Sequence, residues 1–119
     1  MSKINIHAEL KTSEKSYDYI LPAIYHEDDK TIIYKEKDDQ NTTMKFDYKN
    51  KILYRENDSL RMIYKFKKNE TSQGEIFVKG MNRNFFIKLK TLNIKENDIN
   101  IDIRFLVENE NFNYKIEVL

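Results

Sequence analysis

Residues 97–119, NDINIDIRFLVENENFNYKIEVL, alternate between apolar and polar side chains in two consecutive runs. The first run, from Ile99 to Val107, places apolar side chains at odd positions, and the second, from Phe112 to Val118, places them at even positions. This period of two is typical of strands that bury one face and leave the other in water. The segment therefore predicts a long antiparallel hairpin with one apolar face.

The same alternation recurs along most of the chain, whereas a sustained helical period is hard to find. The further strands that it predicts cover about residues 4–10, 15–25, 30–37, 42–48, 52–54, 60–67, 76–78 and 85–91. Polar turns join them, and such short connections make antiparallel neighbours because parallel strands need a long crossover. A sheet with one face to bury and edges to hide closes on itself. We therefore predict an all-β fold, a single antiparallel meandering barrel of about eight to ten strands.

Three local features refine this prediction. Pro22 has no backbone N–H, so it is expected at a strand edge or a bulge. Lys49-Asn50 is the predicted turn of a hairpin, and the strand after it is expected to turn Tyr54 inward. A single helical turn near residues 93–98 is compatible with the pattern but not required.

The composition fits one domain spanning residues 1–119, because 39% hydrophobic and 34% charged residues are usual for a globular chain. A net charge of +1 provides no long-range field to attract nucleic acid or anionic lipid. The absence of cysteine excludes disulfides and thiolate nucleophiles. The amino-terminal sequence has no apolar signal core, and no apolar run approaches the length of a membrane span. We therefore expect a cytoplasmic protein without a membrane partner.

The second half of the chain resembles a known family. LRMIYKFKKNETSQGEIFVK (60–79) and the stretch from Asn84 to Val118 are similar to the YwiB-like family of uncharacterised bacterial proteins with a calycin-like barrel. The Leu60 strand start, the alternating strand that ends at Thr91 and the terminal hairpin carry the resemblance. It implies a lipocalin-like closed barrel and, because calycin relatives often bind apolar molecules in the barrel mouth, a weak expectation of a ligand.

Few residues have the chemistry for catalysis or metal binding. The turn 26–29 groups a histidine with carboxylates, but adjacent residues of one turn rarely converge on one ion. The segment 98–102 imitates the start of a calcium loop, yet Ile103 and Asn109 stand where that loop needs Gly and Glu. His7 lies on a polar face and is expected at the surface, and two glycines do not suffice for a phosphate-binding loop. The sequence thus predicts no enzyme, no metal and no cofactor.

Large aromatic side chains dominate the inward faces of the predicted strands. They are Tyr17, Tyr19, Tyr34, Phe46, Tyr48, Tyr54, Tyr64, Phe66, Phe85, Phe105, Phe112 and Tyr114. Buried tyrosines need partners for their hydroxyl groups, and a small barrel is either filled by side chains or holds one small molecule. Both alternatives stay open here, and the bulk of the aromatic residues favours filling.

The leading hypothesis is a non-enzymatic binding module for a small apolar or amphipathic ligand in the barrel mouth. The candidate ligand-binding residues are Arg61, Tyr64, Phe85, Phe105 and Tyr114. Arg61 and Arg104 lie inside predicted strands, where a guanidinium either clamps a ligand carboxylate or joins a cross-strand ion pair. The ion pair is the favoured interpretation.

The rival hypothesis is a structural or protein-interaction barrel with a filled core. It would form a homodimer, or bind a partner protein, through the outward apolar residues Ile63, Phe77, Phe86 and Leu106. An exposed apolar patch at these positions favours the rival, and an open aromatic cavity favours ligand binding. Binding of single-stranded nucleic acid, with Phe77 and Phe86 as stacking platforms beside strand lysines, is less favoured because the net charge is near zero.

Overall fold

The structure is a computed structural model that describes residues 1–38 and 40–119. Over these residues, strands and one short 3₁₀-helix make up the regular structure. The strands are β1 (Ser2–Lys11), β2 (Ser16–His26), β3 (Thr31–Lys35), β4 (Thr43–Asp47), β5 (Ile52–Glu56), β6 (Leu60–Lys65), β7 (Thr71–Val78), β8 (Arg83–Asn97), β9 (Asn100–Val107) and β10 (Glu110–Val118), and the helix is η1 (Lys79–Met81).

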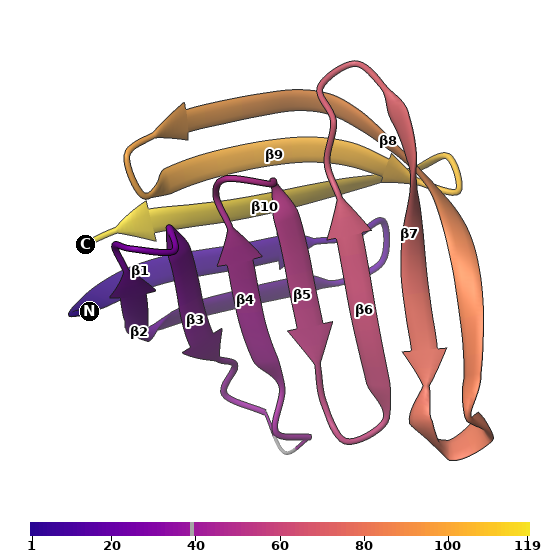
Figure 1. Ribbon diagram of the computed structural model, residues 1–119, viewed down its shortest axis with the longest axis horizontal. Coiled ribbons are helices and arrows are strands. Elements are labelled where there is room, and N and C mark those ends of the chain that lie inside the picture. The colour runs from indigo at the N-terminus through magenta and orange to yellow at the C-terminus, as the bar shows by residue number, and fades with distance from the viewer. Residues whose placement is uncertain (39) are drawn as a thin grey trace.

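The strands form one closed barrel. Each strand pairs antiparallel with its neighbours in sequence, and β1 closes the ring by pairing with β10. In Figure 1, β3 to β7 run roughly vertically, while β9, β10, β1 and β2 run roughly horizontally. The predicted all-β meandering barrel is therefore confirmed.

The alternation that predicted the strands also gives their inward faces. On β9 and β10, Ile101, Ile103, Phe105, Tyr114 and Ile116 are each at most 3% exposed. Phe105 packs between rings from other strands, with a centroid distance of 4.8 Å to Phe66. The wall of the hairpin that ends the chain thus closes on side chains of the barrel itself.

The inward face of β5 differs from the prediction by one residue. Leu53 is fully buried, whereas Tyr54 lies on the outer face. The Lys45 ammonium nitrogen is 5.5 Å from the centroid of the Tyr54 ring. A shift of one residue moves every side chain of a strand to the opposite face. The expected turn at residues 49–50 is correct in position, and it pairs Phe46 with Leu53. Cross-strand partners share a face, so this turn already placed Leu53 inside.

Strand β8 is longer than predicted and contains a bulge. Its register against β9 shifts between Thr91 and Asn93. Odd-numbered residues of β8 face inward up to Thr91, and even-numbered residues face inward from Ile94 onward. Leu92, at the bulge, is 39% exposed. The strand continues to Asn97, so the optional helical turn near residues 93–98 was wrong. Among the described residues no helix is long and apolar enough to span a membrane.

Pro22 lies where β2 loses its partner on one side. β2 pairs with β1 over its first ten residues, but with β3 only from Ile24 to His26. Asn5 lies opposite Pro22 in the β1–β2 ladder, and its carbonyl accepts a hydrogen bond from the Leu119 N–H on the other side of β1, next to β10. Asn5 and Pro22 are therefore not hydrogen-bonded to each other, and the Pro22 nitrogen points away from β1, toward the side of β2 that has no partner there. A residue without an N–H leaves no donor unsatisfied there, which confirms the predicted edge position.

Candidate functional site

The centre of the barrel is filled by aromatic side chains. Phe46 and Tyr114 approach to 6.0 Å between ring centroids, and Tyr64 and Phe105 to 5.8 Å. All four are at most 3% exposed. The five pockets described on the structure lie at the rim or on the outer wall, and none of the five is lined by Phe46, Phe105 or Tyr114. Aromatic side chains therefore fill the interior, which is the alternative that their large volume favoured in the sequence.

The candidate ligand residues chosen from the sequence do not meet in one place. Tyr64, Phe105 and Tyr114 lie in the core, but Phe85 is 39% exposed near the end of the β7–β8 hairpin. Arg61 lies on the outer wall, where its Nε is 3.6 Å from a Glu56 carboxylate oxygen and its guanidinium covers the Phe77 ring. The ion-pair interpretation of Arg61 thus agrees with its surroundings, and the five residues form no common site.

A pair of tyrosine hydroxyls lies inside the barrel. The Tyr34 and Tyr114 oxygens are 2.7 Å apart, and either can donate the hydrogen bond. Burial raises the pKa of both hydroxyls above the ordinary value for tyrosine. Both hydroxyls therefore stay neutral, and one donates to the other, so that each oxygen takes part in a hydrogen bond.

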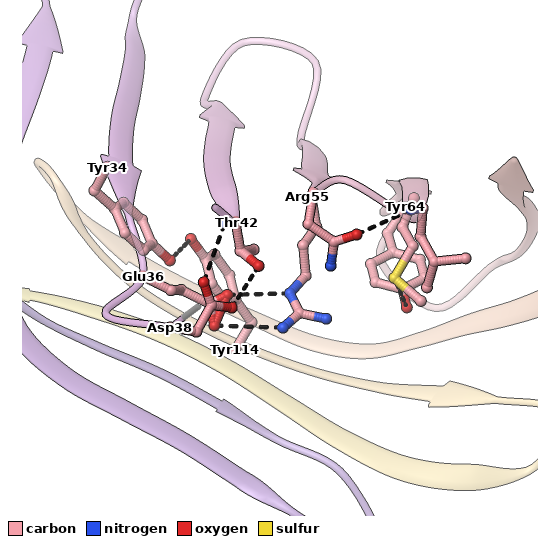
Figure 2. Close-up of polar contacts among 10 residues, drawn as sticks. Tyr34, Glu36, Asp38, Thr42, Arg55, Tyr64 and Tyr114 are labelled. Carbon is pink, nitrogen blue, oxygen red and sulfur yellow. Dashed lines mark hydrogen bonds and ion pairs between the residues drawn. The ribbon is translucent and has the colours of Figure 1, made fainter. Parts of the chain in front are cut away.

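Next to this pair lies an ion pair between Glu36 and Arg55 (Figure 2). Arg55 donates from Nε at 3.1 Å and from a terminal nitrogen at 3.4 Å to the two carboxylate oxygens. The Glu36 side chain is 3% exposed and the Arg55 side chain 13%. Burial lowers the pKa of Arg55, but the hydrogen bonds to Glu36 and its negative charge outweigh burial and raise the pKa above the ordinary value. The Arg55 guanidinium therefore keeps its charge inside the wall of the barrel.

An aromatic ring and a second carboxylate lie near this ion pair. The Arg55 guanidinium lies 4.8 Å from the centroid of the Tyr17 ring. Asp38, shortly after β3, accepts hydrogen bonds from the Thr42 hydroxyl at 2.5 Å and from the Thr42 N–H at 3.2 Å, just before β4 (Figure 2). Burial raises the pKa of the Tyr19 hydroxyl above its ordinary value, and the negative charges of Glu36 and Asp38 raise this pKa further.

Arg55 was not among the predicted site residues because Tyr54, and not Leu53, was expected on the inward face of this strand. The signal that could have found it was the turn at residues 49–50, which pairs Met44 with Arg55 on the inward face. Glu36 was part of the predicted strand 30–37, where it has the same parity as Tyr34. A carboxylate on an inward face implies that an opposite charge, such as a guanidinium, lies close to it, because a buried charge needs a partner.

An open groove lies where β2 and β3 diverge. Its volume is about 530 Å³. Pro22, Ile24 and Ile33 form an apolar side of it, and the nearly buried Tyr34 and Glu36 lie at its base. The remaining lining residues are Leu21, Ala23 and three lysines, Lys3, Lys35 and Lys37. The groove thus combines an apolar surface with a basic rim, directly above the polar groups just described.

The fold is similar to that of the YwiB protein from Bacillus subtilis, a solved crystal structure. The two match with a TM-score of 0.67 at 13% sequence identity, over 96% of this chain and 87% of that chain. The resemblance seen in the sequence is therefore confirmed as a shared YwiB-like barrel fold. No protein-family model matches the chain, and no curated protein does.

Proposed function

We propose that the protein is a non-enzymatic binding module for a small amphipathic anion, of the kind represented by a medium-chain fatty carboxylate. The observation that carries this proposal is the groove between β2 and β3, which is apolar along Pro22, Ile24 and Ile33 and basic at its rim. The apolar part of the ligand lies along this surface, and its anionic group lies among the lysines.

The groove fits a ligand better than the barrel interior does. The interior is occupied by side chains such as Phe46 and Phe105, which are fully buried. The groove, with a volume of about 530 Å³, has the size of sites that take small molecules. It also exposes apolar surface, because Ile24 is 40% exposed beside Pro22. Covering this surface removes it from water, which stabilises the complex.

The charges around the groove favour an anion. In the part of the chain that the structure describes, Lys3, Lys35 and Lys37 form no ion pair. The carboxylate at the base of the groove, Glu36, is compensated by Arg55. The rim therefore has a net positive charge that complements a carboxylate, sulfate or phosphate group.

The first test is native mass spectrometry of the protein purified gently from its own cells, followed by titration with dodecanoate below its micelle concentration. We expect saturable binding of dodecanoate in isothermal titration calorimetry. Dodecylammonium has the same apolar chain and the opposite charge, and should bind more weakly. Binding of neither amphiphile would contradict the proposal, and equal binding of both would contradict the role of the lysines.

Two pairs of variants locate the site. Ile24→Thr shortens the apolar side of the groove, whereas Ile20→Thr changes an equally β-branched residue that is 63% exposed on the same face of β2, outside the groove. Lys35→Glu reverses a rim charge, and Lys90→Glu reverses an exposed lysine of β8. We expect Ile24→Thr and Lys35→Glu to weaken dodecanoate binding, and the two controls to leave it unchanged.

A homodimer is a second candidate, favoured by one observation. Phe86 of β8 is 57% exposed on the outer wall, and Phe77 on the adjacent strand β7 and Ile63 on the next strand, β6, are partly buried. Sedimentation equilibrium tests this candidate. A dimer that Phe86→Ser converts to a monomer would support it, and a monomer at all concentrations would exclude it.

A further inference from the structure

We propose that His7, Glu9 and Asp18 form a binding site for a divalent transition-metal ion of the zinc class on the outer wall of the barrel. One ligand atom from each side chain, an imidazole nitrogen and two carboxylate oxygens, lies within 4.8 Å of the other two. Among the described residues, this is the one set of three histidine and acidic side chains with such convergence. The histidine-containing turn 26–29 does not reach it.

The backbone brings the three residues together. His7 and Glu9 are two positions apart on β1, so both project from its outer face. Asp18 of β2 is the direct register partner of Glu9. The ladder between β1 and β2 continues beyond them in both directions, from the Ser2–Tyr25 pair to the Lys11–Ser16 pair. The ligands are thus held by a paired ladder and not by a loop.

The donor set fits zinc. One imidazole nitrogen and two carboxylate oxygens are ligands that Zn²⁺ binds at about 2.0–2.2 Å, with three protein ligands and one open position for water. The imidazole of His7 and a carboxylate oxygen of Asp18 are already in contact. An ion bound between the three side chains would replace this direct contact, and Glu9 would be its third ligand. Mg²⁺ and Ca²⁺ prefer sites with oxygen ligands alone, so the nitrogen ligand disfavours them.

A metal ion at this site competes with neighbouring lysine side chains for the Glu9 carboxylate. Lys11 Nζ lies 3.6 Å from a Glu9 carboxylate oxygen, and its side chain is 57% exposed. On β10, Lys115 lies opposite Glu9 in register, and its ammonium group is 3.4 Å from Glu117, whose backbone lies opposite His7. A metal ion must displace Lys11 from Glu9, which an exposed lysine permits at little cost.

The test is isothermal titration calorimetry of the full chain with ZnCl₂, together with the shift in melting temperature that zinc causes. We expect one equivalent of Zn²⁺ to bind and to raise the melting temperature, because an ion that binds only the folded state stabilises it. His7→Gln and Asp18→Asn should each weaken binding by about tenfold or more. His26→Gln changes the other histidine and should leave binding unchanged. MgCl₂ should not bind measurably.

A further variant distinguishes a built site from weak surface binding. Lys11→Met removes the ammonium group that competes for Glu9, so it should strengthen zinc binding, while adventitious binding elsewhere would not change. The proposal is overturned if Zn²⁺ does not bind, if His7→Gln and Asp18→Asn bind it as the parent does, or if His26→Gln removes the binding. In those cases the three residues form an ion-pair cluster only. None of these variants lies in the groove between β2 and β3, so this test is independent of the amphiphile proposal.

Discussion

The hydroxyl oxygens of Tyr34 and Tyr114 lie 2.7 Å apart inside the barrel, so that one hydrogen bond connects β3 with β10. Tyr34 is 4% exposed and Tyr114 is fully buried, and neither hydroxyl has another partner in the described structure. A buried hydroxyl that loses its partner keeps the full cost of leaving water. The hydrogen bond therefore stabilises the folded state largely because it leaves neither buried hydroxyl without a partner.

Tyr34→Phe should destabilise the protein by about 1–3 kcal/mol, because it leaves the Tyr114 hydroxyl buried and unsatisfied. Tyr34→Phe combined with Tyr114→Phe should cost less than the sum of the single changes, because the double variant buries no unpaired hydroxyl. Urea unfolding of the parent, both single variants and the double variant measures this coupling. Tyr54→Phe on the outer wall serves as the control and should have little effect. Additive single effects would contradict the prediction.

Glu36→Gln should destabilise the protein by about 3 kcal/mol, because it leaves the Arg55 guanidinium buried without its countercharge. Replacing both partners, Glu36→Leu with Arg55→Met, should restore most of this loss, since no charge then remains inside. The control is Glu56→Gln, which removes the carboxylate from exposed ion pairs with Arg61 and Lys79 and should change stability by less than about 0.5 kcal/mol. Chemical denaturation compares the parent protein with these three variants. Equal losses in Glu36→Gln and Glu56→Gln would show that burial of the pair has no consequence.

The Thr42 hydroxyl should control the acid stability of the turn after β3. Its hydrogen bond to Asp38 lowers the pKa of that carboxyl below the ordinary value of 3.8. A lowered pKa stabilises the folded state above about pH 4, and this contribution disappears as the pH falls through the folded pKa. Thr42→Val should therefore raise the Asp38 pKa in an NMR titration. The loss of stability of the Thr42→Val variant, relative to the parent protein, should be largest near neutral pH and smaller in acid. A loss that is independent of pH would show that the hydrogen bond to Asp38 is not its cause.

Gly74→Ala should destabilise the barrel by about 1–3 kcal/mol, because the added carbon has no room. A Cβ at this position would lie 2.8 Å from Ile87 Cγ1 and 3.3 Å from the Ile63 carbonyl oxygen. Gly80→Ala is the matched control, since a Cβ there meets nothing within 4 Å. It should be neutral or slightly stabilising, because alanine restricts the unfolded chain. Thermal unfolding of the two variants should separate them clearly.

The fold could be predicted because nearly every strand carries its own alternation. The run from Ile99 to Phe105 shows one apolar side chain at every second position, and all of these side chains face the core. β5 is short, and both of its parities contain apolar residues, Ile52 and Tyr54 on one side and Leu53 on the other. Alternation alone is ambiguous there, and the pairing with β4 decides the face.

The candidate sites were harder to predict because they depend on which strands end early. The groove exists because β3 pairs with β2 over three residues only, and no local pattern states how far two strands stay paired. Pro22 was the one local signal of this edge. For the proposed metal site, the sequence places His7 and Glu9 on the polar face of their strand, but the position of Asp18 beside them depends on the register of the β1–β2 ladder.

The pairing of β1 with β10 has a consequence for how the protein is made. The ladder that joins Ile6 to Val118 and Lys11 to Asn113 links the first of the ten strands to leave the ribosome with the last. Until β10 emerges, one side of β1 has no neighbour, and the apolar wall of the nascent sheet has nothing to close against. Closure of the barrel therefore cannot precede the synthesis of β10, and until then the apolar wall of the earlier strands stays open to intermolecular contacts.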